Sequence, residues 1–434
     1  MKNKFLITFL VALITLTGCQ KSENPSVDMT GNVSAAQEQS AVHKTNFLGS
    51  LTQEQLLEDY DYLWDVMDKS YPFFGVIERR GIDVATVYEK YRSELVDITD
   101  GLDLIGLYER MGSDLQNAAH FSIISDTGMY EYIKEIYAEY ATDYPHIGVL
   151  SKILASPATV ETYEKLASIQ ELQIDTIEPA QTESNESTQT ESVSESFIGA
   201  MEVMEEEIPY IWIYEFDDKW EDDHSKLIEF YKANADSQNL IIDIRGNGGG
   251  ADLYWVHNLV EPLLSSPLDK KDYALFNSQS SYTKEYNESL DMYPSAQPVS
   301  ELPDFPALNK DDRSTLDTFM SSAETISPSQ DSIQYEGNIW VLVDEAVYSS
   351  SESFAMFCQS SGFATLVGTV TDGDGGGVDP FLVSQPNSGL VFRFSNLYTL
   401  NADGSNSEES GTTPDILISE DEDALEVCLD TIQS

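Results

Sequence analysis

The stretch "IWVLVDEAVYSSSESFAMF" (residues 339–357) joins an apolar run, a turn and a helical pattern. It predicts a strand, a corner and a helix, with Ser349 to Ser351 at the corner. Ser349-x-x-Glu352 is a capping box, and serine is a preferred residue at the start of a helix. A serine at a helix N-terminus also lies where the helix dipole favours a nucleophile. Because capping boxes are common and nucleophiles are rare, this stretch alone favours the cap.

Similar apolar runs recur through the second half of the chain and predict its fold class. Short runs rich in β-branched and aromatic residues alternate with helical patterns such as "DDHSKLIEFYKANA". The runs are "PYIWIYEF", "NLIIDI", "NIWVLVD", "ATLVG" and "GLVFRFS". Alternating strands and helices indicate an α/β domain with a mixed sheet over residues 205–434.

The first half of the chain has a different pattern. Apolar residues at helical spacing follow a capping box at Thr52-x-x-Gln55, which predicts a small N-terminal helical domain over residues 51–118. Residues 119–204 are expected to connect the two domains. They include the acidic stretch 178–196, which is too poor in apolar side chains to order itself and is therefore expected to be a disordered linker.

The N-terminus carries an export signal. Lys2 and Lys4 precede a short apolar run, which indicates a signal peptide over residues 1–18. The sequence that ends at Cys19, "LTGC", resembles the lipobox of bacterial lipoproteins, in which the cysteine is lipidated and becomes the mature N-terminus. The polar residues from 19 to 50 suit a flexible tether. We therefore expect an exported protein, lipid-anchored to the cell membrane and facing outside the cytoplasm.

Charge and cysteine content limit the partners. The chain has 76 Asp and Glu against 23 Lys and Arg, a formal net charge of −53. Such a surface repels nucleic acid and anionic lipid, so the sequence predicts no nucleic-acid partner. Cys358 and Cys428 lie in apolar helical contexts and are expected to be buried free thiols. No cysteine and histidine spacing matches a zinc site, and we expect neither a metal nor a cofactor.

A glycine-rich turn follows the second of the predicted strands. The stretch "NLIIDIRGNGGGAD" (residues 239–252) runs from a buried strand into a loop whose glycines can present main-chain N–H groups to a ligand. Its formal match to a dinucleotide fingerprint is weak in an exported protein, and a phosphate loop would need a following Gly-Lys-Ser/Thr. The remaining interpretation is an oxyanion hole for a tetrahedral intermediate.

Four segments in order resemble the carboxyl-terminal processing and tricorn-type serine peptidases. "DIRGNGGG" (243–250) is similar to their D-x-R-x-N-x-G-G signature, and "SSSE" (349–352) to their nucleophile motif S-x-S-E. "LQNAAHFSI" (115–123) resembles the histidine segment of the tricorn-type branch. "SEESGTTPDI" (407–416) resembles the closing segment, in which a glutamate precedes Gly-x-x-Pro-Asp. The resemblance implies a ClpP/crotonase-like α/β core and reverses the preference for a simple cap at the serine run.

The resemblance also assigns catalytic roles, position by position. Ser349 matches the nucleophile and His120 the general base, while Glu408 or the adjacent Glu409 matches the acidic member of the relay. These residue types suit the chemistry, because a serine needs a base to take its proton and the base needs an acceptor to orient it.

The same resemblance places an oxyanion hole in the glycine-rich turn. Gly249, with Gly248 as the near alternative, matches the oxyanion glycine, and the main-chain N–H of Ser350 would be the second donor. We expect a side chain at Gly249 to obstruct substrate while leaving the fold largely intact.

This chain departs from the family pattern in three places. Carboxyl-terminal processing peptidases use a lysine base where this chain has Asp374, and tricorn-type members place a serine where it has Ala119. No convincing PDZ segment separates His120 from the core. We therefore expect Asp374 only to shape its loop. Arg245 and Arg393 are the arginines expected to hold a substrate carboxylate.

The combined expectation is a serine-type endopeptidase that hydrolyses peptide bonds in extended or unstructured chains at the cell surface, with no cofactor. The partners it predicts are a peptide or protein substrate and the membrane, through the lipid anchor. The alternative is a catalytically silent peptide-binding lipoprotein on the same fold, which the Asp374 departure leaves open.

Overall fold

The computed structural model describes residues 51–175, 196–204, 207–376, 378–419 and 421–434. All of them belong to one compact unit, residues 45–434. The expected signal peptide, Cys19 and the tether lie outside the described residues, as does the acidic stretch except its last residue, Ser196. Among the helices that are described, each is too short or too polar to span a membrane.

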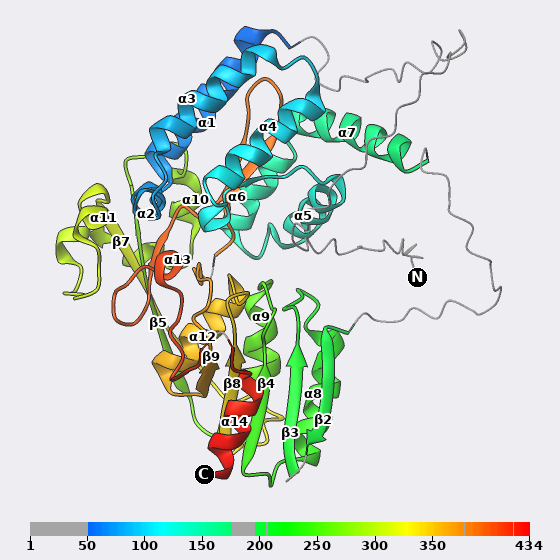
Figure 1. Ribbon diagram of the computed structural model, residues 1–434, viewed down its shortest axis with the longest axis vertical. Helices are drawn as coiled ribbons and strands as arrows, with labels where there is room; N and C mark the ends of the chain where they lie inside the picture. The colour runs from blue at the N-terminus through cyan, green and yellow to red at the C-terminus, as the bar shows by residue number, and fades with distance from the viewer. Residues whose placement is uncertain (1–50, 176–195, 205–206, 377, 420) are drawn as a thin grey trace, which may run out of the picture. The chain divides into compact units, whose positions relative to one another are not determined.

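The centre of the α/β part is a six-stranded sheet in the order β13-β9-β8-β4-β3-β2 (Figure 1). Neighbouring strands are parallel except at the edge, where β2 runs antiparallel to β3. The mixed sheet predicted from the apolar runs is confirmed. Its strands are β2 (Ile198–Met204), β3 (Ile208–Ile213), β4 (Asn239–Asp243), β8 (Asn338–Val343), β9 (Thr365–Gly368) and β13 (Ile416–Leu417).

Helices cover both faces of this sheet, which explains why its inner strands are apolar on both sides. Alternate residues of β4 point to opposite faces: Ile241 packs in one cluster with Cys428 of α14 (Ala424–Gln433), and Ile242 packs in another. The second cluster draws on three helices, α8 (Glu221–Ala233), α9 (Asp252–Trp255) and α12 (Ser350–Ser361). A π-helical turn, Val256–Val260, continues α9. Cys358 and Cys428 are buried free thiols, as predicted.

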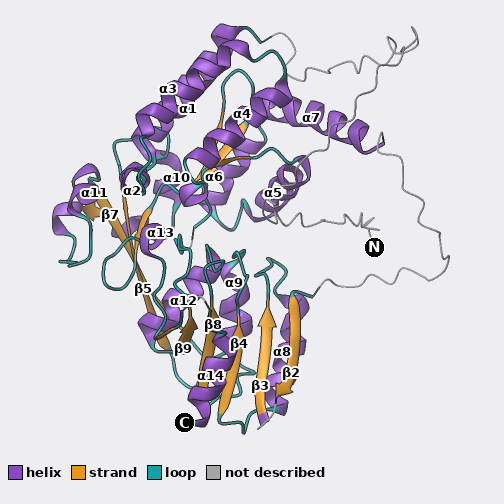
Figure 2. Cartoon of the chain, viewed as in Figure 1, coloured by secondary structure: helices purple, strands orange, loops and turns teal. Residues whose placement is uncertain are grey.

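The other described strands form two smaller sheets. One has the order β12-β5-β7-β6, of which Figure 2 labels β5 and β7, and the other has the order β1-β11-β10. The sequence analysis predicted β11 but none of the other six. The strands are β1 (Ser122–Ile123), β5 (Leu268–Phe276), β6 (Gln297–Pro298), β7 (Thr318–Ile326), β10 (Phe381–Ser384), β11 (Val391–Phe394) and β12 (Tyr398–Leu400). The same part of the chain has three short helices, α10 (Lys284–Ser289), α11 (Lys310–Thr315) and α13 (Ser407–Ser410).

The N-terminal helices begin at the predicted place, because Thr52 and Gln55 form the expected capping box on the first of them. They continue beyond residue 118, where the helical domain was expected to end, and three lie in the stretch expected to be a connection. Their largest core cluster also contains Phe392, Phe394 and Tyr398 from β11 and β12, so the helices pack on the strands. The helices are α1 (Gln53–Ser70), α2 (Phe74–Arg79), α3 (Val84–Glu94), α4 (Gly101–Asp114), α5 (Thr127–Tyr140), α6 (Pro145–Leu154) and α7 (Pro157–Asp175).

Candidate active site

Two loops meet at the carboxyl edge of the six-stranded sheet. The glycine-rich turn follows β4, and the serine corner follows the neighbouring parallel strand β8. Carboxyl ends of adjacent parallel strands lie at one edge, so the sheet brings these two turns together. Ser351 joins them, because its hydroxyl donates to the main-chain carbonyl of Asn247 at 2.5 Å.

Ser349 has a strained main chain, and its side chain does not cap the helix that follows. It occupies the N-cap position of α12 with φ 57° and ψ −122°, and its hydroxyl makes no capping hydrogen bond. A non-glycine residue in that region is held there by its surroundings. Here the Ser349 N–H donates to the carbonyl of Gly373 at 3.0 Å. The capping interpretation therefore does not describe Ser349.

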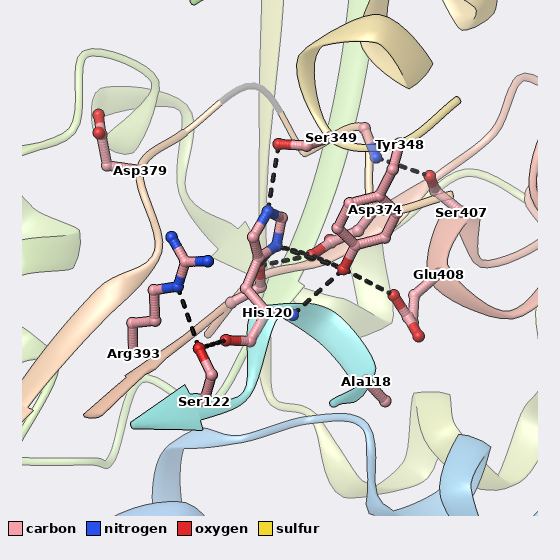
Figure 3. Close-up of polar contacts among 12 residues, drawn as sticks. Ala118, His120, Ser122, Tyr348, Ser349, Asp374, Asp379, Arg393, Ser407 and Glu408 are labelled. Atoms are coloured by element: carbon pink, nitrogen blue, oxygen red, sulfur yellow. Dashed lines mark hydrogen bonds and ion pairs between the residues drawn. The ribbon is translucent and has the colours of Figure 1, made fainter. Parts of the chain in front are cut away.

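The Ser349 hydroxyl faces His120 instead (Figure 3). Ser349 Oγ lies 3.2 Å from His120 Nε2, across 229 positions of sequence. The other ring nitrogen, Nδ1, lies 2.5 Å from Asp374 Oδ2. A carboxylate on Nδ1 holds the proton there and leaves Nε2 free to accept the serine proton. Serine, imidazole and carboxylate form one continuous chain of polar contacts.

The carboxylate in this chain is not the one predicted. Asp374 was expected only to shape its loop, yet its residue is 3% exposed and its Oδ2 also accepts a hydrogen bond from the Ser395 hydroxyl at 2.7 Å. Its φ is 51°, a left-handed conformation that aspartate tolerates better than most residues. Flanking glycines pack the loop tightly, since a Cβ on Gly375 would lie 2.9 Å from Glu352. The loop therefore buries Asp374 beside the imidazole.

The glycine-rich turn places main-chain donors beside Ser349. Gly249 has φ 108°, and a Cβ there would lie 2.9 Å from both Ser349 Cβ and Ser350 N. Its own N–H donates to Asn247 Oδ1 at 2.9 Å. Among the described residues, the N–H groups of Gly248 and Ser350 have no protein acceptor. The predicted oxyanion glycine, Gly249, therefore already has an acceptor, whereas its near alternative Gly248 and the second predicted donor Ser350 do not.

A model of peptidase family S41 matches residues 207–418 of this chain. That segment contains the glycine-rich turn, the serine corner and Asp374, which have just been placed at one site. Residues 207–418 belong to peptidase family S41. The S41 segment excludes His120, which the preceding helical part supplies.

Solved structures resemble a larger share of the chain. A candidate peptidase from Parabacteroides merdae is 18% identical with a TM-score of 0.52, and the match covers 88% of this chain and 98% of that one. A lipoprotein from Streptococcus agalactiae is 11% identical with a TM-score of 0.41, covering 87% of this chain and 96% of that one. The first of these shows a shared fold that includes the N-terminal helices. No curated protein matches the chain.

Neither glutamate predicted for the relay holds the imidazole. Glu408 pairs with Arg80 at 3.0 Å, contacts the main-chain N–H of Ala119 and lies 3.4 Å from the Tyr348 hydroxyl. Glu409 forms an ion pair with Arg79 at 2.6 Å. Burial, and to a smaller extent the nearby Asp374, raise the pKa of Glu408 to about 7. Glu408 therefore supports the residue before His120 and does not touch the ring.

Glu352 of the S-x-S-E motif is buried under the serine corner. Its Oε1 accepts a hydrogen bond from the Thr412 hydroxyl at 2.7 Å, and its other oxygen has no partner among the described residues. Burial raises the pKa of Glu352 to about 7. The glutamate therefore faces the packed loops rather than the reacting serine.

The two arginines expected at a substrate carboxylate have different surroundings. Arg245 pairs with Asp243 at 2.7 Å and with Asp423 at 3.1 Å, so protein carboxylates already occupy its guanidinium. Within the described ranges, Arg393 donates only through Nε, to the Ser122 hydroxyl at 3.1 Å. The structure leaves Arg393 as the arginine with free donors at this site and gives Arg245 a structural role.

Sequence reasoning missed three residues that contact the imidazole or its neighbours. These are Asp374, Ser395 and Tyr348, whose hydroxyl accepts from the His120 N–H at 3.2 Å. The sequence carried one signal for Asp374, which lies between two glycines. A carboxylate buried in such a loop is costly unless a partner stabilises it. Within the residues described, no group of three or more His, Cys, Asp or Glu side chains is arranged to hold a metal ion.

Proposed function

We propose that this S41 protein is an active serine peptidase with Ser349 as nucleophile, His120 as general base and Asp374 as the carboxylate that orients His120. The observation that carries the proposal is the unbroken sequence of contacts from Ser349 Oγ through both imidazole nitrogens to Asp374 Oδ2, at 3.2 Å and 2.5 Å. Both distances suit proton transfer within hydrogen-bond reach.

The reaction follows from these positions. Ser349 Oγ attacks the peptide carbonyl carbon while its proton passes to His120 Nε2. Asp374 stabilises the imidazolium that forms, and collapse of the tetrahedral intermediate transfers the proton to the leaving amine. Water then attacks the acyl-serine ester, with His120 again as base, and releases the carboxylic acid product. Every proton that leaves Ser349 or water is thus carried by one imidazole.

The oxyanion is assigned to the N–H groups of Gly248 and Ser350. Both lack an acceptor among the described residues. Gly248 precedes Gly249, whose added Cβ would lie 2.9 Å from Ser349 Cβ, and Ser350 begins helix α12, whose dipole favours negative charge at that end. The substrate class is an extended or unstructured polypeptide cleaved internally, because strand-like peptides can add main-chain hydrogen bonds at a sheet edge.

The place of action is proposed to be the outer face of the cell membrane. The signal-like segment and the lipobox-like sequence at Cys19 support export and a lipid anchor. Cys19→Ala should move the mature protein from the membrane fraction to the soluble fraction. Unchanged fractionation of that variant would count against the anchor.

The activity is tested by reaction with a fluorophosphonate and by hydrolysis of unfolded protein substrates. The wild type should be labelled at Ser349, and Ser349→Ala and His120→Ala should each lose turnover by about a millionfold, because residues that act as one unit are not additive. A wild type that neither labels nor cleaves, yet binds extended peptides, would favour the silent binding protein instead. The intact contacts of His120 favour turnover.

A further inference from the structure

Arg393 differs from the other arginines that the structure describes. Most pair with a carboxylate, and Arg313 donates to the main-chain carbonyl of Val299 at 3.2 Å. In the described part of the chain, neither terminal nitrogen of Arg393 has an acceptor, and only Nε is bonded. The arginines that pair with carboxylates are Arg79, Arg80, Arg92, Arg110 and Arg245.

The free guanidinium lies beside the proposed catalytic residues. Arg393 is the register partner of Ser122 in the β1–β11 pair, and the Ser122 hydroxyl in turn donates to the His120 carbonyl at 3.3 Å. Ser395 follows two positions later and reaches Asp374. Residues two apart along an extended segment point to the same side, about 7 Å apart. In Figure 3 the guanidinium projects from β11 on the side of His120 and Ser349.

No carboxylate among the described residues forms an ion pair with this cation, although the net charge of the chain is −53. Asp379, which Figure 3 also shows, accepts from the Tyr137 hydroxyl at 2.8 Å and forms no ion pair with Arg393. Burial lowers the pKa of Arg393. A largely buried cation with unmatched donors is unfavourable until an anion reaches it. The unmatched donors form the planar fork that binds a carboxylate through two parallel hydrogen bonds.

We propose that Arg393 binds a substrate carboxylate within about two residues of the cleaved bond, and so makes the enzyme selective for peptides that carry one there. The proposal rests on the proposed peptidase function and names its specificity determinant. The carboxylate can come from a free C-terminus or from an Asp or Glu side chain. Either source presents the same pair of oxygens to the guanidinium.

The test measures peptide binding, so it does not depend on turnover. Full-length protein with Ser349→Ala is titrated into fluorescein-labelled decapeptides that lack other acidic residues. One arm compares a free C-terminus with a C-terminal amide, and the other compares Glu with Gln at a central position of the amidated peptide. Each arm is repeated with Arg393→Gln added, and with Arg313→Gln added as a matched arginine whose partner is a main-chain carbonyl.

In at least one arm, the carboxylate peptide should bind about tenfold to a hundredfold more tightly than its neutral partner, the range expected for a charged hydrogen-bonded pair. Arg393→Gln should remove that ratio, and Arg313→Gln should keep it. Equal affinities in both arms, a preference that survives Arg393→Gln, or no binding by any peptide would overturn the proposal. The arm that responds identifies the source of the carboxylate. Fluorophosphonate labelling of the wild type reports separately on the peptidase function, so the two failures are distinguishable.

Discussion

The loop that carries Ser349 and the loop that carries His120 are both strained, but they are held in different ways. The serine corner has one non-glycine residue at positive φ, Ser349, and its contacts go to Asn247 and Gly373, which belong to the same α/β part of the chain. The histidine loop has four, namely Gln116, Asn117, Ala119 and His120, with φ between 49° and 61°. Each left-handed residue of this kind costs roughly 1–2 kcal/mol.

The histidine loop is therefore held by distant segments. The Tyr71 hydroxyl donates to the Ala118 carbonyl at 2.7 Å, the Ser395 N–H donates to the Ala119 carbonyl at 2.8 Å, and Tyr348 and Glu408 contact its main chain. The serine corner is thus held within the α/β part of the chain, whereas the histidine loop needs contacts from segments as far apart as Tyr71 and Glu408. The loop of Asp374 contacts both of them, because Asp374 bonds His120 and the preceding Gly373 bonds the Ser349 N–H. Substitutions in these three loops can therefore test how each one is held.

The largest effect on kcat is expected from a substitution of Asp374, which contacts His120. Asp374→Asn keeps the shape of the side chain but favours the wrong imidazole tautomer, so kcat should fall by up to about ten thousandfold with little change in Tm. Asp372→Asn, in the exposed neighbour of the same loop, is the control and should leave kcat unchanged. If Asp374→Asn stays active while Glu408→Gln does not, the orienting carboxylate is Glu408 after all.

A second comparison should separate loss of stability from loss of catalysis in the glycine-rich turn. A Cβ on Gly248 meets nothing within 4 Å, whereas one on Gly249 would lie 2.7 Å from the Tyr348 carbonyl. Gly248→Val keeps the main-chain N–H but places a side chain where the substrate carbonyl would approach, so kcat/KM should fall by up to about the hundredfold to thousandfold that loss of one oxyanion donor costs, at unchanged Tm. Gly249→Val should also lower Tm, which revises the expectation that the fold would tolerate it. Equal Tm losses in both variants would mean that both glycines are structural.

A smaller effect is expected from the supports of the histidine loop. Tyr348→Phe removes the hydroxyl that accepts the His120 N–H at 3.2 Å, one hydrogen bond worth about 1 kcal/mol. We expect kcat to fall by about fivefold, with a larger change in kcat than in KM. Tyr88→Phe, whose hydroxyl contacts Asp61 at 3.1 Å, is the matched control. A Tyr348→Phe enzyme as fast as the wild type would show that the loop holds its shape without this contact.

The smallest effect is on stability, under the serine corner. The pKa of Glu352 is about 7 in the folded chain, above its usual 4.5, so the folded state keeps a proton that the unfolded chain has released. The free energy of unfolding should therefore fall as pH rises from about 4.5 to 7, by at most about 3 kcal/mol for this group. Glu352→Gln should flatten that decline and raise Tm at pH 8.

Exposed Glu336→Gln serves as the control in the same thermal melts and should leave the slope unchanged. Some decline should remain in Glu352→Gln, because the pKa of Glu408 is also about 7. A Glu352→Gln protein with the wild-type slope would show that this carboxyl does not hold its proton in the folded state.

The same contrast explains what could be predicted from sequence. The inner strands and the serine corner were predicted because burial on both faces makes β4 and β8 continuous apolar runs. Strands β5 and β7 were missed because half-exposed positions such as Lys270 and Asp272 break their apolar pattern. His120 was found through a short motif. Asp374 was not, because its role depends on a loop that folds back 254 positions along the chain.

The separation between His120 and Ser349 also sets when the protein can act. Their contact spans 229 positions, and the strands and helices that support His120 come from as late as Ser395 and Glu408. Contacts this distant form late in folding, because the intervening chain must first be made and closed into a loop. His120 is synthesised before Ser349, and the site is complete only after Ser395 and Glu408 have also been added. In the proposed peptidase, the order of synthesis therefore delays assembly of the catalytic site until nearly the whole chain has been made.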